Sequence, residues 1–426
     1  MTSILEAAQS MTVTPAIRAV ADDEGIGPDE VCRRIADGRV VVMQRSGRCV
    51  GIGAGLRTKI NVNLGTSNVS VSPDDEVKKA RIAERYGADT ISDLSMGGDI
   101  PAIRAAVARE TTLPVTTVPV YQAVAENGLE DLTADDILAT IRAQADEGVS
   151  SLVVHCVNDR MLDLLKAQGR VMGVVSKGGS ITASFMHLNH CQNPFVEHFD
   201  EILAIAREHE IVLSLGNTAR SGCIHDGQDA VQMEEMRQNI ELAHYAHQHG
   251  VQVIIEGAGG HVRLDRIGQV IRSYKIRSSF PLFVAGPLPT DVAAGYDHIA
   301  GAVGASAASA AGADYLCYIT PAEHLGLPTP EQVKEGLIAF RIAAHIGDTV
   351  KRDADGRDLE MAKNRAGFDR DAQVACCFDP ERARQIMGAG GDGTCTMCGD
   401  FCAIRLMRAI CGPGKSTDAR EKSVRP

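Results

Sequence analysis

Three cysteines lie close together near the end of the chain, at Cys395, Cys398 and Cys402. Three thiolates can hold a [4Fe–4S] cluster and leave its fourth iron without a protein ligand. In radical enzymes this open iron chelates S-adenosylmethionine, and one electron then splits the sulfonium to give a 5′-deoxyadenosyl radical. The spacing therefore predicts chemistry that depends on a [4Fe–4S] cluster and S-adenosylmethionine.

A zinc site is the alternative interpretation of the same cysteines. Zinc takes four ligands in a structural site, and Cys376, Cys377 or Cys411 could supply the fourth. A disulfide is disfavoured, because we expect the chain to lie in the reducing cytoplasm. The spacing favours the cluster over zinc.

Polar residues follow one predicted strand after another. On a (β/α)-barrel the carboxyl ends of the strands form the rim on which the site is built. Lys177 and Arg220, with nearby glycine N–H groups, could bind a phosphate. Each residue alone is more often a turn or a helix cap, but as a ring they predict a small-molecule site. The ring comprises Asn63, Ser92, Asp93, Tyr121, His155, Ser176, Lys177, Gly178, Asn217 to Arg220 and Glu256.

Two histidines, His261 and His324, also follow predicted strands. Their imidazoles could converge on one divalent metal, with water or substrate completing the shell. The pattern alone does not separate them from the other histidines, which we expect to be hydrogen-bonded surface or core residues. These are His190, His198, His225, His298 and His345.

The elements that position these residues alternate from about residue 58 to about residue 350. Short β-rich runs separated by helical patterns predict a parallel sheet with crossover helices, and we expect an α/β fold with a (β/α)8 TIM-type barrel. Nine candidate strands compete for eight places, so one is wrong or one strand is irregular. They are Lys59 to Leu64, Thr90 to Leu94, Val115 to Val120, Leu152 to Cys156, Met172 to Ser176, Ile211 to Leu215, Val251 to Ile255, Leu282 to Ala285 and Tyr315 to Thr320.

Start signals support the helices between these strands. Ser72 before Pro73, and Thr133 before two aspartates, are typical N-caps. The Ala-, Gly- and Ser-rich stretch 291–313 predicts a helix packed closely on the barrel. Before the barrel we predict helices at Thr14 to Asp22 and Asp29 to Ala36 and a β-like run at Arg39 to Met43.

We expect five regions along the chain. They are an N-terminal leader domain (1–57), the catalytic barrel (58–350), a helical extension (351–387), a cluster-binding segment that begins with a glycine-rich linker (388–411) and a disordered tail (412–426). A length of 426 residues fits one barrel of about 250 to 300 residues with terminal additions.

Charge and hydropathy limit the partners. A net charge of -12 without a long basic run argues against nucleic acid. We find no N-terminal apolar stretch typical of a signal peptide and no span of membrane length, so we expect a cytoplasmic location with the twelve cysteines reduced.

Several motifs occur together in one order. The sequence resembles the phosphomethylpyrimidine synthase (ThiC) family of radical S-adenosylmethionine enzymes from about residue 50 to Cys402. This family includes the thiamin-pyrimidine synthase and its paralogue, 5-hydroxybenzimidazole synthase. The motifs are Lys59-Ile-Asn-Val-Asn-Leu-Gly, Ala88-Asp-Thr with Asp93-Leu-Ser, Thr117-Val-Pro-Val-Tyr-Gln-Ala123, Val175-Ser-Lys-Gly-Gly, Leu213-Ser-Leu-Gly, Gly286-Pro-Leu with Gly295-Tyr-Asp-His298, Thr320-Pro-Ala-Glu-His-Leu-Gly-Leu-Pro328 and the terminal Cys395-Thr-Met-Cys-Gly-Asp-Phe-Cys402.

The resemblance implies a homodimeric (β/α)8 barrel that rearranges 5-aminoimidazole ribotide, with a mobile cluster segment over the active site of the partner subunit. It implies Cys395, Cys398 and Cys402 as cluster ligands, and His261 and His324 as ligands of a divalent metal such as zinc. We expect Glu256 and His155 to hold or move protons, and an electron-donor protein to reduce the cluster. The implied substrate contacts are Asn63, Ser92, Tyr121, His155, Ser176, Lys177, Gly178, Asn217, Thr218, Ala219, Arg220, Glu256 and Phe283.

Some positions depart from the thiamin branch of the family. Ser92 replaces a methionine, Phe283 a tyrosine, and the loop from Glu256 to His261 is one residue longer. Leu215-Gly-Asn217 and Ile224-His-Asp226 resemble the benzimidazole branch. We therefore favour 5-hydroxybenzimidazole as the product.

Other functions stay open. The thiamin pyrimidine is the alternative product from the same substrate. A zinc-dependent barrel lyase or hydrolase, and an inactive paralogue or one that pairs with a homologous subunit, are further possibilities.

Overall fold

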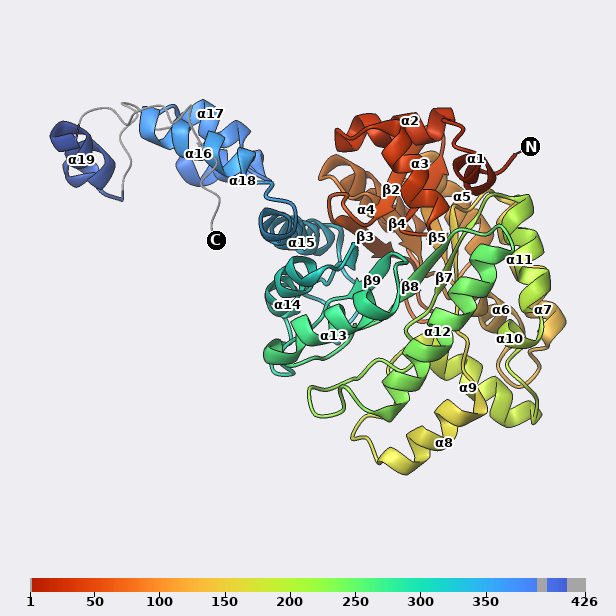
Figure 1. Cartoon of the computed structure of the whole chain (residues 1–426). Helices are drawn as coiled ribbons and strands as arrows, with labels where there is room; N and C mark the ends of the chain where they lie inside the picture. Colours follow the sequence, from red (N-terminus) through yellow and green to blue (C-terminus); the bar gives the residue numbers. More distant parts are fainter. Residues whose placement is uncertain (1, 389–396, 412–426) are drawn as a thin grey trace. The chain divides into compact units, whose positions relative to one another are not determined.

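The computed structural model describes residues 2–388 and 397–411. Eight parallel strands close into a barrel in the order β10-β3-β4-β5-β6-β7-β8-β9, which confirms the predicted (β/α)8 fold (Figure 1). The strands are β3 (Lys59–Leu64), β4 (Thr90–Asp93), β5 (Val115–Thr117), β6 (Ser151–Val154), β7 (Val212–Leu215), β8 (Val253–Glu256), β9 (Leu282–Ala285) and β10 (Tyr315–Cys317).

Helices connect these strands and form the outer layer. Thr133 caps α7 as predicted, and the structure adds a capping box with Asp136. Ser72 precedes α4 as predicted, but its hydroxyl donates to Asp75 rather than capping the backbone. The helices are α4 (Pro73–Arg85), α5 (Ile100–Arg109), α6 (Pro119–Asn127), α7 (Ala134–Asp146), α8 (Asp159–Gln168), α9 (Lys177–Asn189), α10 (Pro194–Glu197), α11 (Phe199–Glu208), α12 (Ala230–Gln248), α13 (Leu264–Arg277), α14 (Asp297–Ala311) and α15 (Pro330–Lys351).

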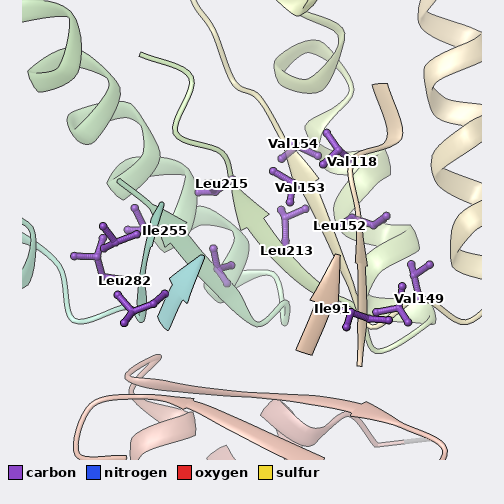
Figure 2. Close-up of a cluster of buried hydrophobic side chains, with 14 of the residues drawn as sticks. Ile91, Val118, Val149, Leu152, Val153, Val154, Leu213, Leu215, Ile255 and Leu282 are labelled. Carbon is purple, nitrogen blue, oxygen red and sulfur yellow. The ribbon is translucent and has the colours of Figure 1, made fainter. Parts of the chain in front are cut away.

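The main hydrophobic core lies between the barrel and these helices. Alternate strand residues such as Leu152, Leu213 and Ile255 belong to it, and Figure 2 shows part of this cluster. Helix α14 packs closely, as expected from its small residues, because a Cβ at Gly304 would lie 1.9 Å from the carbonyl oxygen of Pro287. Outward side chains are thus buried by helices, and inward ones are left to fill the barrel.

The leader closes the amino end of the barrel. Its helices α2 (Pro15–Glu24) and α3 (Pro28–Ala36) confirm the two predicted helices, and α1 (Ile4–Gln9) precedes them. The predicted β-like run is β1 (Val40–Arg45), which pairs with an unpredicted strand, β2 (Arg48–Gly53). Apolar side chains of this hairpin form one cluster with residues from the strands: Val41, Met43, Val50, Ile52, Val212, Ile254 and Tyr315. The leader belongs to the same compact unit as the barrel, Met1–Asp353.

The predicted strand at Met172 to Ser176 is wrong. This segment is a loop before α9, and the barrel is complete without it. The backbone N–H groups of Val171 and Met172 donate to Asp226, at 2.8 Å each, instead of to a neighbouring strand. A short apolar run resembles a buried strand in sequence, but here its backbone has other partners.

The second compact unit, Ala354–Pro426, contains the helical extension. Helices α16 (Gly356–Gly367), α17 (Arg370–Ala375) and α18 (Pro380–Met387) fall within the predicted helical region. A short 3-10 helix, η1 (Gly399–Phe401), and α19 (Ala403–Cys411) follow. Cys395, most of the predicted linker and the predicted tail lie outside the described residues. Within the described part of the chain, no helix is long and apolar enough to cross a membrane.

Candidate active site

A pocket lies where the barrel strands end. Eight of the residues predicted to contact a substrate line it together: Asn63, Ser92, Tyr121, His155, Asn217, Arg220, Glu256 and Phe283. The remaining lining residues are Leu94, Val118, Val153, Ala285 and Cys317. A concave, partly apolar site with a few convergent polar groups is typical of small-molecule binding.

Strand alternation explains why these residues meet. On β3, Ile60 and Val62 belong to the outer core, so the intervening Asn61 and the following Asn63 point into the barrel. On β8, the same rule directs Glu256 inward beside Ile255, which faces the helices. Residues far apart in sequence therefore share one site because their strands are parallel and in register.

Glu256 is the buried carboxylate of the pocket. Its Oε1 accepts from the hydroxyl of Ser214 at 2.8 Å, and its Oε2 accepts from the backbone N–H of Asn217 at 3.3 Å. Burial raises the pKa of Glu256, against the lowering effects of these hydrogen bonds and of Arg220. A carboxyl group whose pKa is raised in a pocket is suited to exchange a proton with a ligand.

We predict that Glu256→Gln stabilises the fold and reduces turnover. Because the folded state raises the pKa of Glu256, the ionised carboxylate costs folding free energy as pH rises above its unfolded pKa, about 4.3. Glutamine removes that cost, and its NH2 group can donate to the hydroxyl of Ser214, which can also accept, while its oxygen keeps the N–H of Asn217. The melting temperature should therefore rise by about 2 °C at pH 8 and by less at pH 5. Thermal melts at both pH values measure this, and an equal or lower melting temperature at pH 8 contradicts it.

His155 faces the pocket as a neutral imidazole. Burial, and then the charge of Arg220, lower the pKa of His155 to about 3. Its Nδ1 is buried and has no hydrogen-bond partner in the described structure. A buried polar atom without a partner is costly, so Nδ1 is suited to bind a polar group of a ligand.

The start of helix α9 adjoins this imidazole. The hydroxyl of Ser176 accepts from the backbone N–H of Gly179 at 3.1 Å and so caps the helix. A Cβ at Gly178 would lie 2.3 Å from the ring of His155, so the backbone can approach this closely only with glycine. The Nζ atom of Lys177 lies 5.3 Å from the ring centre of Tyr121, which lines the pocket together with Arg220. Burial, followed by the charge of Arg220, lowers the pKa of Lys177. A helix amino end beside two cations is suited to an anion such as phosphate.

The two predicted metal ligands meet despite their distance in sequence. Nε2 of His261 lies 3.3 Å from Nε2 of His324. Asp291 contacts Nδ1 of His261 at 2.7 Å, and Asp297 contacts Nδ1 of His324 at 3.2 Å. A carboxylate on the far nitrogen of each imidazole is the usual support of a metal-binding histidine. Within residues 2–388 and 397–411, no group of three or more potential ligands converges, so the described protein offers two.

Two predicted contact residues have a different environment. Thr218 and Ala219 line a neighbouring, largely apolar cavity between α8 and α9 rather than the pocket of Glu256. Among the cluster cysteines, Cys398 is exposed and Cys402 is half-buried, on either side of η1. The roles of these residues stay predictions.

Sequence reasoning missed several residues of the site. Cys317 lines the pocket, and burial raises the pKa of its thiol to about 12. The predicted strand runs to Thr320, whereas the observed strand ends at Cys317, whose inward direction follows from the alternation that begins at Tyr315. Asp297 lies inside the motif Gly295-Tyr-Asp-His298, but Asp291 had no local signal.

The barrel is closed, and polar side chains converge in a pocket at the carboxyl ends of its strands. This arrangement is typical of barrel enzymes that act on small molecules. The model of the radical SAM ThiC family matches residues 3–409. The chain belongs to this family. It is therefore a radical S-adenosylmethionine enzyme, whose chemistry requires a [4Fe–4S] cluster and S-adenosylmethionine.

Curated relatives match over almost their whole length. The chain is 45% identical to a phosphomethylpyrimidine synthase of Dehalococcoides mccartyi (strain BAV1), with 94% of this chain and 96% of the relative covered. It is 44% identical to that of Methanoculleus marisnigri, covering 95% and 98%, and 42% identical to that of Geobacter metallireducens, covering 95% and 97%.

Proposed function

We propose that this enzyme converts 5-aminoimidazole ribotide to the phosphomethylpyrimidine of thiamin biosynthesis. The observation that carries the proposal is the near full-length similarity, at 42–45% identity, to proteins named phosphomethylpyrimidine synthase. It takes precedence over the short motifs that favoured 5-hydroxybenzimidazole, because those concern few positions. The zinc-dependent lyase alternative does not agree with the family.

The pocket supports a phosphorylated aminoimidazole as the substrate. Lys177 and Arg220, with the amino end of α9, would bind the phosphate. The neutral His155 and the partly buried amide of Asn63 would hydrogen-bond the imidazole and ribose. Glu256 would hold or receive a proton at its carboxyl group, because burial raises its pKa.

Cys395, Cys398 and Cys402 would hold the cluster, as the resemblance implies. The cluster supplies the electron that cleaves S-adenosylmethionine to a 5′-deoxyadenosyl radical. A divalent metal, with zinc as the proposed ion, would bind between His261 and His324, where two imidazole nitrogens face each other. There it would neutralise an anionic group of a bound ligand, while Asp291 and Asp297 fix the orientation of the rings.

We also propose a cytoplasmic homodimer that receives electrons from a donor protein. Helices α14 and α15 carry exposed apolar residues that a second copy would bury: Ile299, Val303, Ile342, Ile346 and Val350. Sedimentation of the anaerobic protein measures the mass of the assembly, and a monomer at micromolar concentration contradicts the dimer.

Anaerobic incubation of the reconstituted enzyme with 5-aminoimidazole ribotide, S-adenosylmethionine and a reductant tests the function. The expected products are 5′-deoxyadenosine and the phosphorylated pyrimidine, identified by mass spectrometry. A hydroxybenzimidazole product would overturn the proposed product and assign the enzyme to the 5-hydroxybenzimidazole branch of the family. Formation of 5′-deoxyadenosine without consumption of the ribotide would overturn the proposed substrate.

A further inference from the structure

Glu235 is a buried carboxylate behind the pocket, on helix α12. It is 1% exposed, and both of its oxygens contact the loop that follows β7. Oε2 accepts from the side-chain amide of Asn217 at 2.6 Å, and Oε1 accepts from the backbone N–H of Ala219 at 2.8 Å. Burial raises the pKa of Glu235 to about 8, although these two donors lower it. Above that pKa the ionised carboxylate accepts both bonds, so the loop depends on a charge that is costly to bury and is retained with matched donors.

Asn217 connects this carboxylate to a second loop. While its Nδ2 donates to Glu235, its Oδ1 accepts from the backbone N–H of Gly259 at 3.3 Å. The hydroxyl of Ser221 donates to the carbonyl of His261 at 2.6 Å, and the N–H of His261 donates to the carbonyl of Ser221 at 3.1 Å. The loop that carries Arg220 and the loop that carries His261 are thus joined at two points, one of which depends on Glu235.

We propose that Glu235 is a positioning residue that, through Asn217, holds these two loops in the arrangement that binds substrate. The proposal rests on the proposed ribotide substrate, because Asn217 and Arg220 line the pocket assigned to it. Glu235 itself does not line that pocket, so its effect is transmitted through the loops. Among charged residues of α12, Glu241 offers a matched control, because its 63% exposed side chain pairs with Arg237 on the same helix.

The direction of each hydrogen bond makes the proposal testable by exchange of partners. In Glu235→Gln, the NH2 group of the new glutamine faces the NH2 group of Asn217, so two donors meet. If Asn217 turned over to offer its oxygen instead, its own NH2 group would face the N–H of Gly259, which is also a donor. In the double variant Glu235→Gln with Asn217→Asp, the carboxylate at position 217 accepts from both the new amide and Gly259. Asn217→Asp alone places two carboxylates in contact, which is unfavourable in a buried site.

Calorimetric titration of the anaerobic, reconstituted enzyme with 5-aminoimidazole ribotide at pH 9, where Glu235 is ionised, tests this arrangement. We expect each single variant to bind about 10- to 100-fold more weakly than the unchanged enzyme, the double variant to bind more tightly than either, and Glu241→Gln to bind normally. Unchanged binding by Glu235→Gln, or a double variant as weak as the sum of the two single effects, overturns the proposal. If Glu235→Gln does not fold, the affinities of Asn217→Asp and of the double variant for the ribotide are compared. Tighter binding by the double variant supports the proposal, and equal or weaker binding overturns it.

Amide hydrogen exchange separates this inference from the proposed substrate. In Glu235→Gln without ligand, the peptides that contain Ala219 and Gly259 should exchange faster, while those of the distant strand β4 should not change. If the unchanged enzyme fails to bind the ribotide, the proposed substrate is wrong, and exchange at these two peptides still measures the positioning role. Unchanged exchange at both peptides overturns it.

Discussion

The Cys398→Ala variant is expected to lose its cluster and to form no detectable 5′-deoxyadenosine. Removing one of three thiolates leaves only two protein ligands, which is too few to retain a [4Fe–4S] cluster with an open iron. Iron and sulfide analysis of the anaerobically reconstituted protein, together with chromatography of 5′-deoxyadenosine, measures both losses. The unchanged enzyme should contain about four irons per chain.

Cys411→Ala is the matched control for this experiment. Cys411 lies at the end of α19, and its side chain is exposed. If Cys395, Cys398 and Cys402 alone hold the cluster, this variant keeps its iron and its 5′-deoxyadenosine formation. Loss of iron in Cys411→Ala would show that a fourth thiolate takes part, and turnover by Cys398→Ala would refute the cluster assignment.

His324→Ala is expected to lose the divalent metal while it keeps the [4Fe–4S] cluster. The removed imidazole is one of the two protein ligands that the described structure brings together. Loss of an outer carboxylate partner commonly costs 10- to 100-fold in metal affinity, so loss of a ligand should cost at least about 100-fold. Competition with a zinc chelator measures the affinity, and iron analysis shows that the cluster remains.

Two further variants provide an intermediate case and a control for the zinc affinity of His324→Ala. Asp291→Asn keeps both imidazoles but weakens the support of His261, so its zinc affinity should fall by about 10- to 100-fold, between those of the unchanged enzyme and His324→Ala. His225→Ala removes an exposed histidine and should bind zinc normally. Normal zinc binding by His324→Ala would place the metal elsewhere.

Local patterns predicted all eight barrel strands because each is a short β-rich run, although most of the predicted ranges differ from the observed ones by one to three residues at one or both ends. Lys59–Leu64 and Leu282–Ala285 agree with the prediction at both ends. The run at Met172 to Ser176 carries a similar pattern, but Asp226 binds the backbone that leads into it and the barrel has no place for a ninth strand. Whether an apolar run becomes a strand thus depends on available partners, which the sequence does not display locally.

The sequence by itself determined the cysteine spacing, the alternation of strands and helices, and most of the polar residues that line the pocket. Those features follow from local chemistry and from the two-residue period of a strand. Only the tertiary structure decided that His261 and His324 face each other, that Cys317 joins the pocket and that Glu235 supports it from behind. These relations depend on closure of the barrel, which brings the ends of distant strands and their loops within hydrogen-bonding distance.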